Sequence, residues 1–131
     1  MRLRAIPSRL ATGAFILHSG IEKLRVDAER ATALHGMAAG AYPNLQGLSP
    51  QRFVRALALA EIAVGAALLV PLVGDRLAGL ALSAFSGALV LMYWRTPRMR
   101  KSGSVWPTQA GLPLSKDVWM LGIGLGLVVG G

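Results

Sequence analysis

Ionisable side chains that interrupt apolar segments are the residues of this chain best suited to chemistry. His18, Glu22 and Lys23 lie near the end of the first apolar segment, and Glu61 interrupts the segment 56–74. Lys116 and Asp117 open the last apolar segment. Ionisable groups in apolar surroundings often mark ligand sites and proton relays, and the histidine imidazole titrates near neutral pH. These residues therefore form a candidate polar site that could hold a quinone-like head group or relay protons.

The same residues also have a purely structural interpretation, which we favour. A lone carboxylate in an apolar helix is costly and is usually paired, so Glu61 is expected to bind Lys23 or His18 and thereby fix the register of two helices. His18 and Glu22 are four residues apart and share one helical face. By helical rise, Glu61 lies roughly 15 Å and His18 roughly 9 Å from the ends of their segments. For Lys116 and Asp117, helix capping and snorkelling of the lysine is the favoured interpretation.

Apolar segments long enough to cross a bilayer position these residues. Residues 77–94 carry no charged side chain and are bracketed by Arg76 and Arg95. A helix rises about 1.5 Å per residue, so this segment nearly matches a hydrocarbon core of roughly 30 Å. Charged residues make up only 15% of the chain, whereas soluble domains have about 25%. We therefore predict an all-α integral membrane four-helix bundle, with spans at about 6–24, 51–70, 76–94 and 115–130.

The connections predict an up-down-up-down order of these spans in a single domain over residues 1–131. Ser49-Pro50 is a typical helix start, and Ser115 with Asp117 repeats the pattern. The short connection between the second and third spans makes them antiparallel neighbours. The longer connections 25–50 and 95–114 then lie on one side. Within the first, residues 26–37 are expected to form a helix that rests on the membrane or caps the bundle.

The net charge of +8 indicates contact with anionic lipid head groups. The basic residues flank apolar segments and form no amphipathic stripe, which argues against a nucleic-acid surface. Most of them adjoin the two long connections, so the positive-inside rule places these connections in the cytoplasm and both termini outside. Arg95, Arg98, Arg100 and Lys101 form a basic segment. This segment is favoured as a lipid-contacting, topogenic cluster, with docking of a partner as the alternative.

Several other kinds of site are excluded or disfavoured. The chain has no cysteine, which excludes dithiol chemistry, thiolate-bound zinc and iron–sulfur clusters. No metal site is predicted, and no covalently bound cofactor. Haem ligation by His18 and His35 is disfavoured because no histidine occupies a facing span. The glycine run 122–126 lacks the residues of a phosphate loop, and close helix packing explains it better. Gly13, Gly20, Gly65 and Gly79 are expected to serve the same purpose.

Three motifs in order along the chain resemble the DoxX-like family of small four-span membrane proteins. The first span ends in His18-Ser19-Gly20-Ile21-Glu22-Lys23-Leu24, similar to the family's Gly-x-x-Lys motif. The second carries Glu61 followed by Gly65 and a run of aliphatic residues. The fourth opens with Lys116-Asp117 and an apolar run that contains glycine. Each motif alone is weakly specific, but together they cover most of the chain.

The resemblance implies a multi-pass protein of the bacterial inner membrane. It further implies a non-catalytic subunit or accessory of a redox or quinone-linked process, with a soluble or membrane oxidoreductase as partner. One alternative is an oxidoreductase subunit that itself binds quinone through His18, Glu61 and Lys23. Another is a small transporter or permeation subunit. The small-residue surfaces are compatible with a compact monomer or with an oligomer.

Overall fold

The chain is all-helical in the computed structural model, which describes residues 2–95 and 117–130. The elements in these ranges are the α-helices α1 (Ile6–Lys23), α2 (Ala28–Ala41), α3 (Pro50–Leu69), α4 (Asp75–Arg95) and α6 (Asp117–Gly130), and the short 3-10 helices η1 (Leu3–Ala5) and η2 (Pro43–Gly47). No strand occurs in the described part of the chain. The predicted all-α class is thus confirmed.

Local capping explains where two of these helices begin. The side chain of Ser49 accepts a hydrogen bond from the Arg52 amide at 3.3 Å, and Pro50 occupies the first helical position of α3. The predicted start of this helix is therefore confirmed to within one residue. Asp27 accepts from the Arg30 amide at 2.8 Å and begins α2 in the same way.

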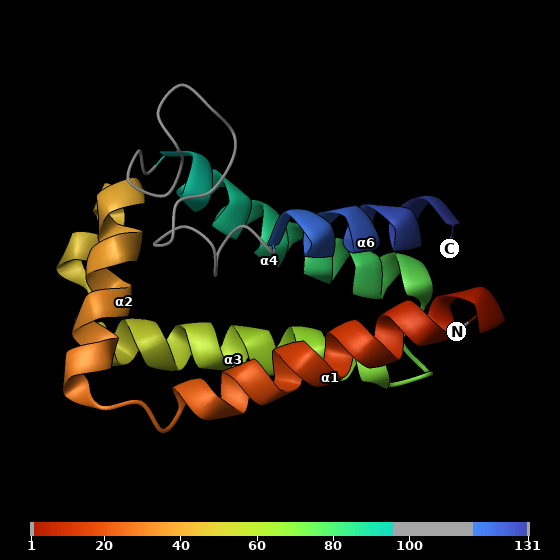
Figure 1. The fold of residues 1–131 in the computed structure, drawn as a ribbon, viewed down its shortest axis with the longest axis horizontal. Coiled ribbons are helices and arrows are strands. Elements are labelled where there is room, and N and C mark those ends of the chain that lie inside the picture. The colour runs from red at the N-terminus through yellow and green to blue at the C-terminus, as the bar shows by residue number, and fades with distance from the viewer. Residues whose placement is uncertain (1, 96–116, 131) are drawn as a thin grey trace.

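Four of the helices, α1, α3, α4 and α6, are arranged as two antiparallel pairs (Figure 1). Helix α1 packs along α3, and α4 packs along α6, while a less extensive contact between α3 and α4 joins the pairs. Helix α2 lies across the end of α3 that is remote from both termini (Figure 1). There Ala38 and Met92 are buried among Met37, Leu45 and Phe53. The predicted helix at 26–37 therefore forms at 28–41 and packs over one end of the helix pairs.

Glycines allow the backbones of each pair to approach closely. A Cβ atom added to Gly65 would lie 2.8 Å from the Leu17 nitrogen, and one added to Gly20 would lie 2.8 Å from the Ala58 oxygen. In the other pair, a Cβ on Gly79 would lie 2.6 Å from the Gly124 oxygen. Gly122 and Gly126 have open space at the same position. The expected packing role of the run 122–126 is therefore correct for Gly124 and wrong for these two neighbours.

Helix length and composition distinguish α4 from the other described helices. Among the described helices, it alone is long and apolar enough to cross a bilayer, over Asp75–Met92, and 33% of that stretch is buried. Helix α6 is apolar but has only 14 residues, Asp117–Gly130. Helices α1 and α3 coincide with the expected first and second spans, but charged side chains lower their hydropathy.

We predict opposite effects for two glycine substitutions in helices of the same pair. Gly79→Ala should lower the free energy of unfolding by about 1–3 kcal/mol, because its methyl group meets the backbone of α6. Gly122→Ala should be neutral or should stabilise α6 by up to about 1 kcal/mol, because alanine has the higher helix propensity. Thermal unfolding in mild detergent would measure both. Equal effects of the two changes would contradict the close α4–α6 approach.

Candidate functional site

The structure joins two of the predicted site residues, Lys23 and Glu61, across the α1–α3 contact. The Lys23 Nζ atom lies 2.9 Å from Glu61 Oε1 and donates to Glu61 Oε2 at 3.2 Å. It also donates to Ser19 Oγ at 2.8 Å, one turn earlier on α1. Glu61 is buried, with its side chain 7% exposed, and Lys23 is 21% exposed. The ammonium thus has acceptors in Ser19 and in both oxygens of the carboxylate. Of the two partners that the structural interpretation allowed for Glu61, the structure shows Lys23.

His18 and Glu22 lie on the outer side of α1. Their side chains are 74% and 65% exposed, and His18 Nε2 lies 3.6 Å from Glu22 Oε1. A helix turns about 100° per residue, so His18 and Glu22 lie more than a quarter turn around α1 from Ser19 and Lys23, and their exposure shows that they do not pack on α3. No hydrogen bond or ion pair joins His18 to Glu61 within the described ranges. The structure therefore separates the residues of the proposed His18–Glu61 pocket.

A small pocket does lie beside Lys23, where α1 ends and α2 and α3 begin. Its volume is about 170 Å³, and its lining includes Lys23, Val26, Asp27 and Arg55. Neither His18 nor Glu61 lines it. Pockets that hold small molecules usually measure about 300–1,000 Å³, so this space is small for a quinone ring.

The remaining predicted residues are only partly described. Asp117 is buried, 3% exposed, at the start of α6. Arg95 ends α4, and its guanidinium carbon lies 5.5 Å from the centroid of the Tyr42 ring, a cation–π contact between α4 and the end of α2. Lys116, Arg98, Arg100 and Lys101 lie outside the described residues, so their predicted roles stay predictions. No group of histidine and carboxylate side chains that could hold a metal occurs in the ranges 2–95 and 117–130.

The most extensive polar contact involves a residue that was not a predicted site residue, Arg9 of α1. Its side chain is completely buried, and Nη1 lies 2.6 Å from Oδ1 of Asp75 at the start of α4. Nε donates to the Leu68 oxygen at 2.8 Å, and Nη2 donates to the Ala67 oxygen at 2.8 Å. The remaining bonds go from Nη2 to the Val70 oxygen at 3.1 Å and from Nη1 to the Val73 oxygen at 2.9 Å. A guanidinium has five N–H groups, and all five are used.

Arg9 provides hydrogen-bond donors for backbone carbonyl groups at the end of α3. The last carbonyl groups of any helix have no partner within the helix, and this end of the helix carries partial negative charge. The guanidinium supplies donors to two of these carbonyls and to two more in the turn that leads into α4. We call this arrangement of Arg9, Asp75 and the four carbonyls the Arg9 cap. It joins α1, α3 and α4 through one side chain.

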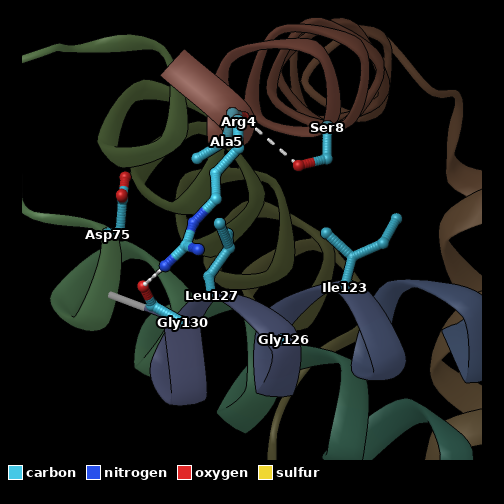
Figure 2. Close-up of a pocket in the computed structure, with 8 residues that line it drawn as sticks. All are labelled: Arg4, Ala5, Ser8, Asp75, Ile123, Gly126, Leu127 and Gly130. Carbon is cyan, nitrogen blue, oxygen red and sulfur yellow. Dashed lines mark hydrogen bonds between the residues drawn. The ribbon is translucent and has the colours of Figure 1, made fainter. Parts of the chain in front are cut away.

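The same end of the molecule holds a second pocket, of about 300 Å³, between the start of α1, the start of α4 and the end of α6 (Figure 2). Arg4 extends to α6, where its Nη2 donates to the Gly130 oxygen at 2.6 Å (Figure 2). Ile123 and Leu127 form the apolar wall on α6, and Asp75 lies on the side toward α4. Arg4 thus contacts the end of α6 as Arg9 contacts the end of α3.

Comparison with known proteins finds no family model, curated protein or solved structure that matches this chain. The DoxX-like resemblance therefore remains a prediction that rests on the three motifs.

We predict that the Arg9 cap is a major determinant of stability. Arg9→Met should lower the free energy of unfolding by about 3–5 kcal/mol, because it leaves the buried Asp75 carboxylate without its cation. Arg9→Lys should recover little of this loss, because an ammonium has three donors and cannot reproduce the planar geometry. Thermal unfolding in detergent would measure the effect.

A double-mutant cycle separates the charge pair from the carbonyl contacts. Adding Asp75→Asn to Arg9→Met should restore part of the lost stability, since no charge is then left buried and unpaired. Arg25→Met serves as control, because Arg25 is exposed between α1 and α2. Strict additivity of the two substitutions would contradict the pairing.

Proposed function

We propose that the chain is an integral membrane protein whose helices α1, α3, α4 and α6 cross the bilayer in up-down-up-down order. Several polar side chains of these helices are buried, namely Arg9, Glu61, Asp75 and Ser86, whereas His18 and Glu22 are exposed near the end of α1. Large apolar side chains are exposed on each of these four helices: Leu10 and Phe15 on α1, Leu59 on α3, Leu77 and Leu80 on α4, and Trp119 and Val129 on α6. Apolar residues on the outside and paired charges inside suit a protein surrounded by lipid.

We further propose that it is a non-catalytic subunit or accessory of a redox or quinone-linked process in the bacterial inner membrane, like the DoxX-like proteins that it resembles. The pairing of its buried charges carries this proposal. All N–H groups of the Arg9 guanidinium donate to Asp75 or to backbone carbonyls, and both Glu61 oxygens contact Lys23. Such groups hold helices in register and leave little capacity for a substrate. A soluble or membrane oxidoreductase would then supply the catalysis.

The proposal that α3 spans the bilayer predicts opposite membrane sides for its two flanking connections. The chain has no cysteine, so single cysteines can be placed without background. Leu72 is 96% exposed in the α3–α4 connection, and Gln46 is exposed before α3. Leu72→Cys should react with a membrane-impermeant maleimide in spheroplasts, whereas Gln46→Cys should react only after permeabilisation. Reaction of both at the same side, or recovery of the protein in the aqueous fraction, would refute the spanning arrangement.

Substitution of Glu61 distinguishes the proposed accessory role from the alternatives. Glu61→Gln should reduce the amount of folded, membrane-inserted protein, because Lys23 loses its charged partner. The pair replacement Lys23→Met with Glu61→Leu should restore the amount toward wild type. Quantitative immunoblotting of membranes and quinone-reduction assays would be run together. Fully assembled Glu61→Gln protein with lost quinone reduction would favour the quinone-binding alternative, and assembled protein with altered solute or proton flux would favour the transporter.

A further inference from the structure

The start of α1 concentrates positive charge where helices usually place acids. Arg2 and Arg4 precede α1, Arg9 lies within it, and neither η1 nor α1 has an acidic residue in its first turn. The N-terminal end of a helix is itself partially positive, so cations there are unfavourable unless an anion is near. Asp75 offsets Arg9. It also accepts from the Arg2 amide at 3.2 Å, so both of its oxygens are in use.

Arg4 retains capacity for an anion at this positively charged corner. One of its N–H groups donates to the Gly130 oxygen, and a guanidinium has five such groups. Arg4 is exposed and lines the 300 Å³ pocket. Guanidinium groups bind phosphate in a planar, often bidentate geometry. The end of the pocket that is lined by Arg4 therefore suits a phosphate group.

The walls of the pocket change from polar to apolar along α6. Gly130 and Arg4 lie at one end, and Leu127 and then Ile123 follow toward the middle of the helix (Figure 2). Gly130 lies seven positions after Ile123, which corresponds to about 10 Å of helical rise. A ligand that fits this lining has an anionic head and an apolar continuation. The volume of about 300 Å³ is at the lower limit for small-molecule sites, which suits a head group with the first part of one chain.

We propose that this pocket binds an anionic membrane phospholipid with its phosphate on Arg4 and its apolar chain against Ile123 and Leu127. The Asp75 carboxylate also lines the pocket, and its charge is offset by Arg9. The inference rests on the proposed location of the chain in a bilayer. It assigns the lipid to the membrane face that carries both termini, where the end of α6 meets the start of α1. By contacting Arg4 and the apolar wall of α6, the lipid would connect these helices at a place where the described contacts between them are sparse.

The test uses full-length protein reconstituted in nanodiscs that contain phosphatidylcholine with 30% phosphatidylglycerol, followed by native mass spectrometry of the retained lipids. We expect wild-type protein to retain phosphatidylglycerol in preference to phosphatidylcholine. Arg4→Gln should reduce this retention about fivefold, the effect of one basic residue near an anionic lipid surface. Gly126→Leu should reduce it as strongly, because Gly126 lines the pocket and its added side chain enters open space.

Two matched controls keep the charge and the glycine effects apart. Arg76→Gln removes the same charge near the start of α4 outside the pocket, and Gly122→Leu adds the same side chain to α6 outside it. Both variants should retain phosphatidylglycerol at wild-type levels.

Equal losses in variants and controls, or equal retention of the two lipids, would overturn the lipid site. Displacement of the lipid by millimolar inorganic phosphate would also overturn it, in favour of a simple anion site. Failure of wild-type protein to enter nanodiscs would refute the membrane proposal as well, whereas entry without lipid preference would refute the lipid site alone.

Discussion

The capping of α3 by Arg9 is the interaction on which the arrangement of the helices depends. A single buried guanidinium contacts the last carbonyls of α3, the turn after it and the first residue of α4. Because Arg9 belongs to α1, its position also sets the register of α1 against α3. Gly13 lies one turn after Arg9 and packs on Leu68 and Leu69, so the glycine contact and the cap require the same alignment.

The second charge pair joins the end of α1 to the middle of α3. Gly20 and Gly65 bring the two backbones close together near this pair and between it and the Arg9 cap. Burial of these charges carries a desolvation cost that only pairing offsets, and the cost is greatest in lipid. In water, the large apolar side chains exposed on α1, α3, α4 and α6 would be unfavourable, whereas in lipid they would not. The proposed membrane location accounts for both observations together.

Sequence patterns predicted the helical segments and a partner for Glu61, either Lys23 or His18, but missed the Arg9 cap. Ser49-Pro50 marks a helix start locally, and a lone intramembrane carboxylate requires a cation nearby, so both features follow from neighbouring residues. Arg9 only lowers the hydropathy of its segment, and its pairing with Asp75 depends on the three-dimensional alignment of α1 with α3. Helix rotation was equally inaccessible: Gly122, Gly124 and Gly126 look equivalent in the sequence, yet only Gly124 faces α4. The same uncertainty in rotation grouped His18 with Glu61, which the structure separates.

In the proposed arrangement α3 lies in the bilayer despite Glu61, with its apolar side toward lipid. Leu59 is 55% exposed on α3 and lies two residues from Glu61, which is buried. A spin label on Leu59→Cys in phosphatidylcholine–phosphatidylglycerol vesicles would report its surroundings by collision with oxygen, which concentrates in lipid, and with a water-soluble nickel complex. If α3 lies in the bilayer, the label on Leu59→Cys should be highly accessible to oxygen and poorly accessible to the nickel complex, and a label on Gln46→Cys should show the reverse. High accessibility of the Leu59→Cys label to the nickel complex would contradict this arrangement.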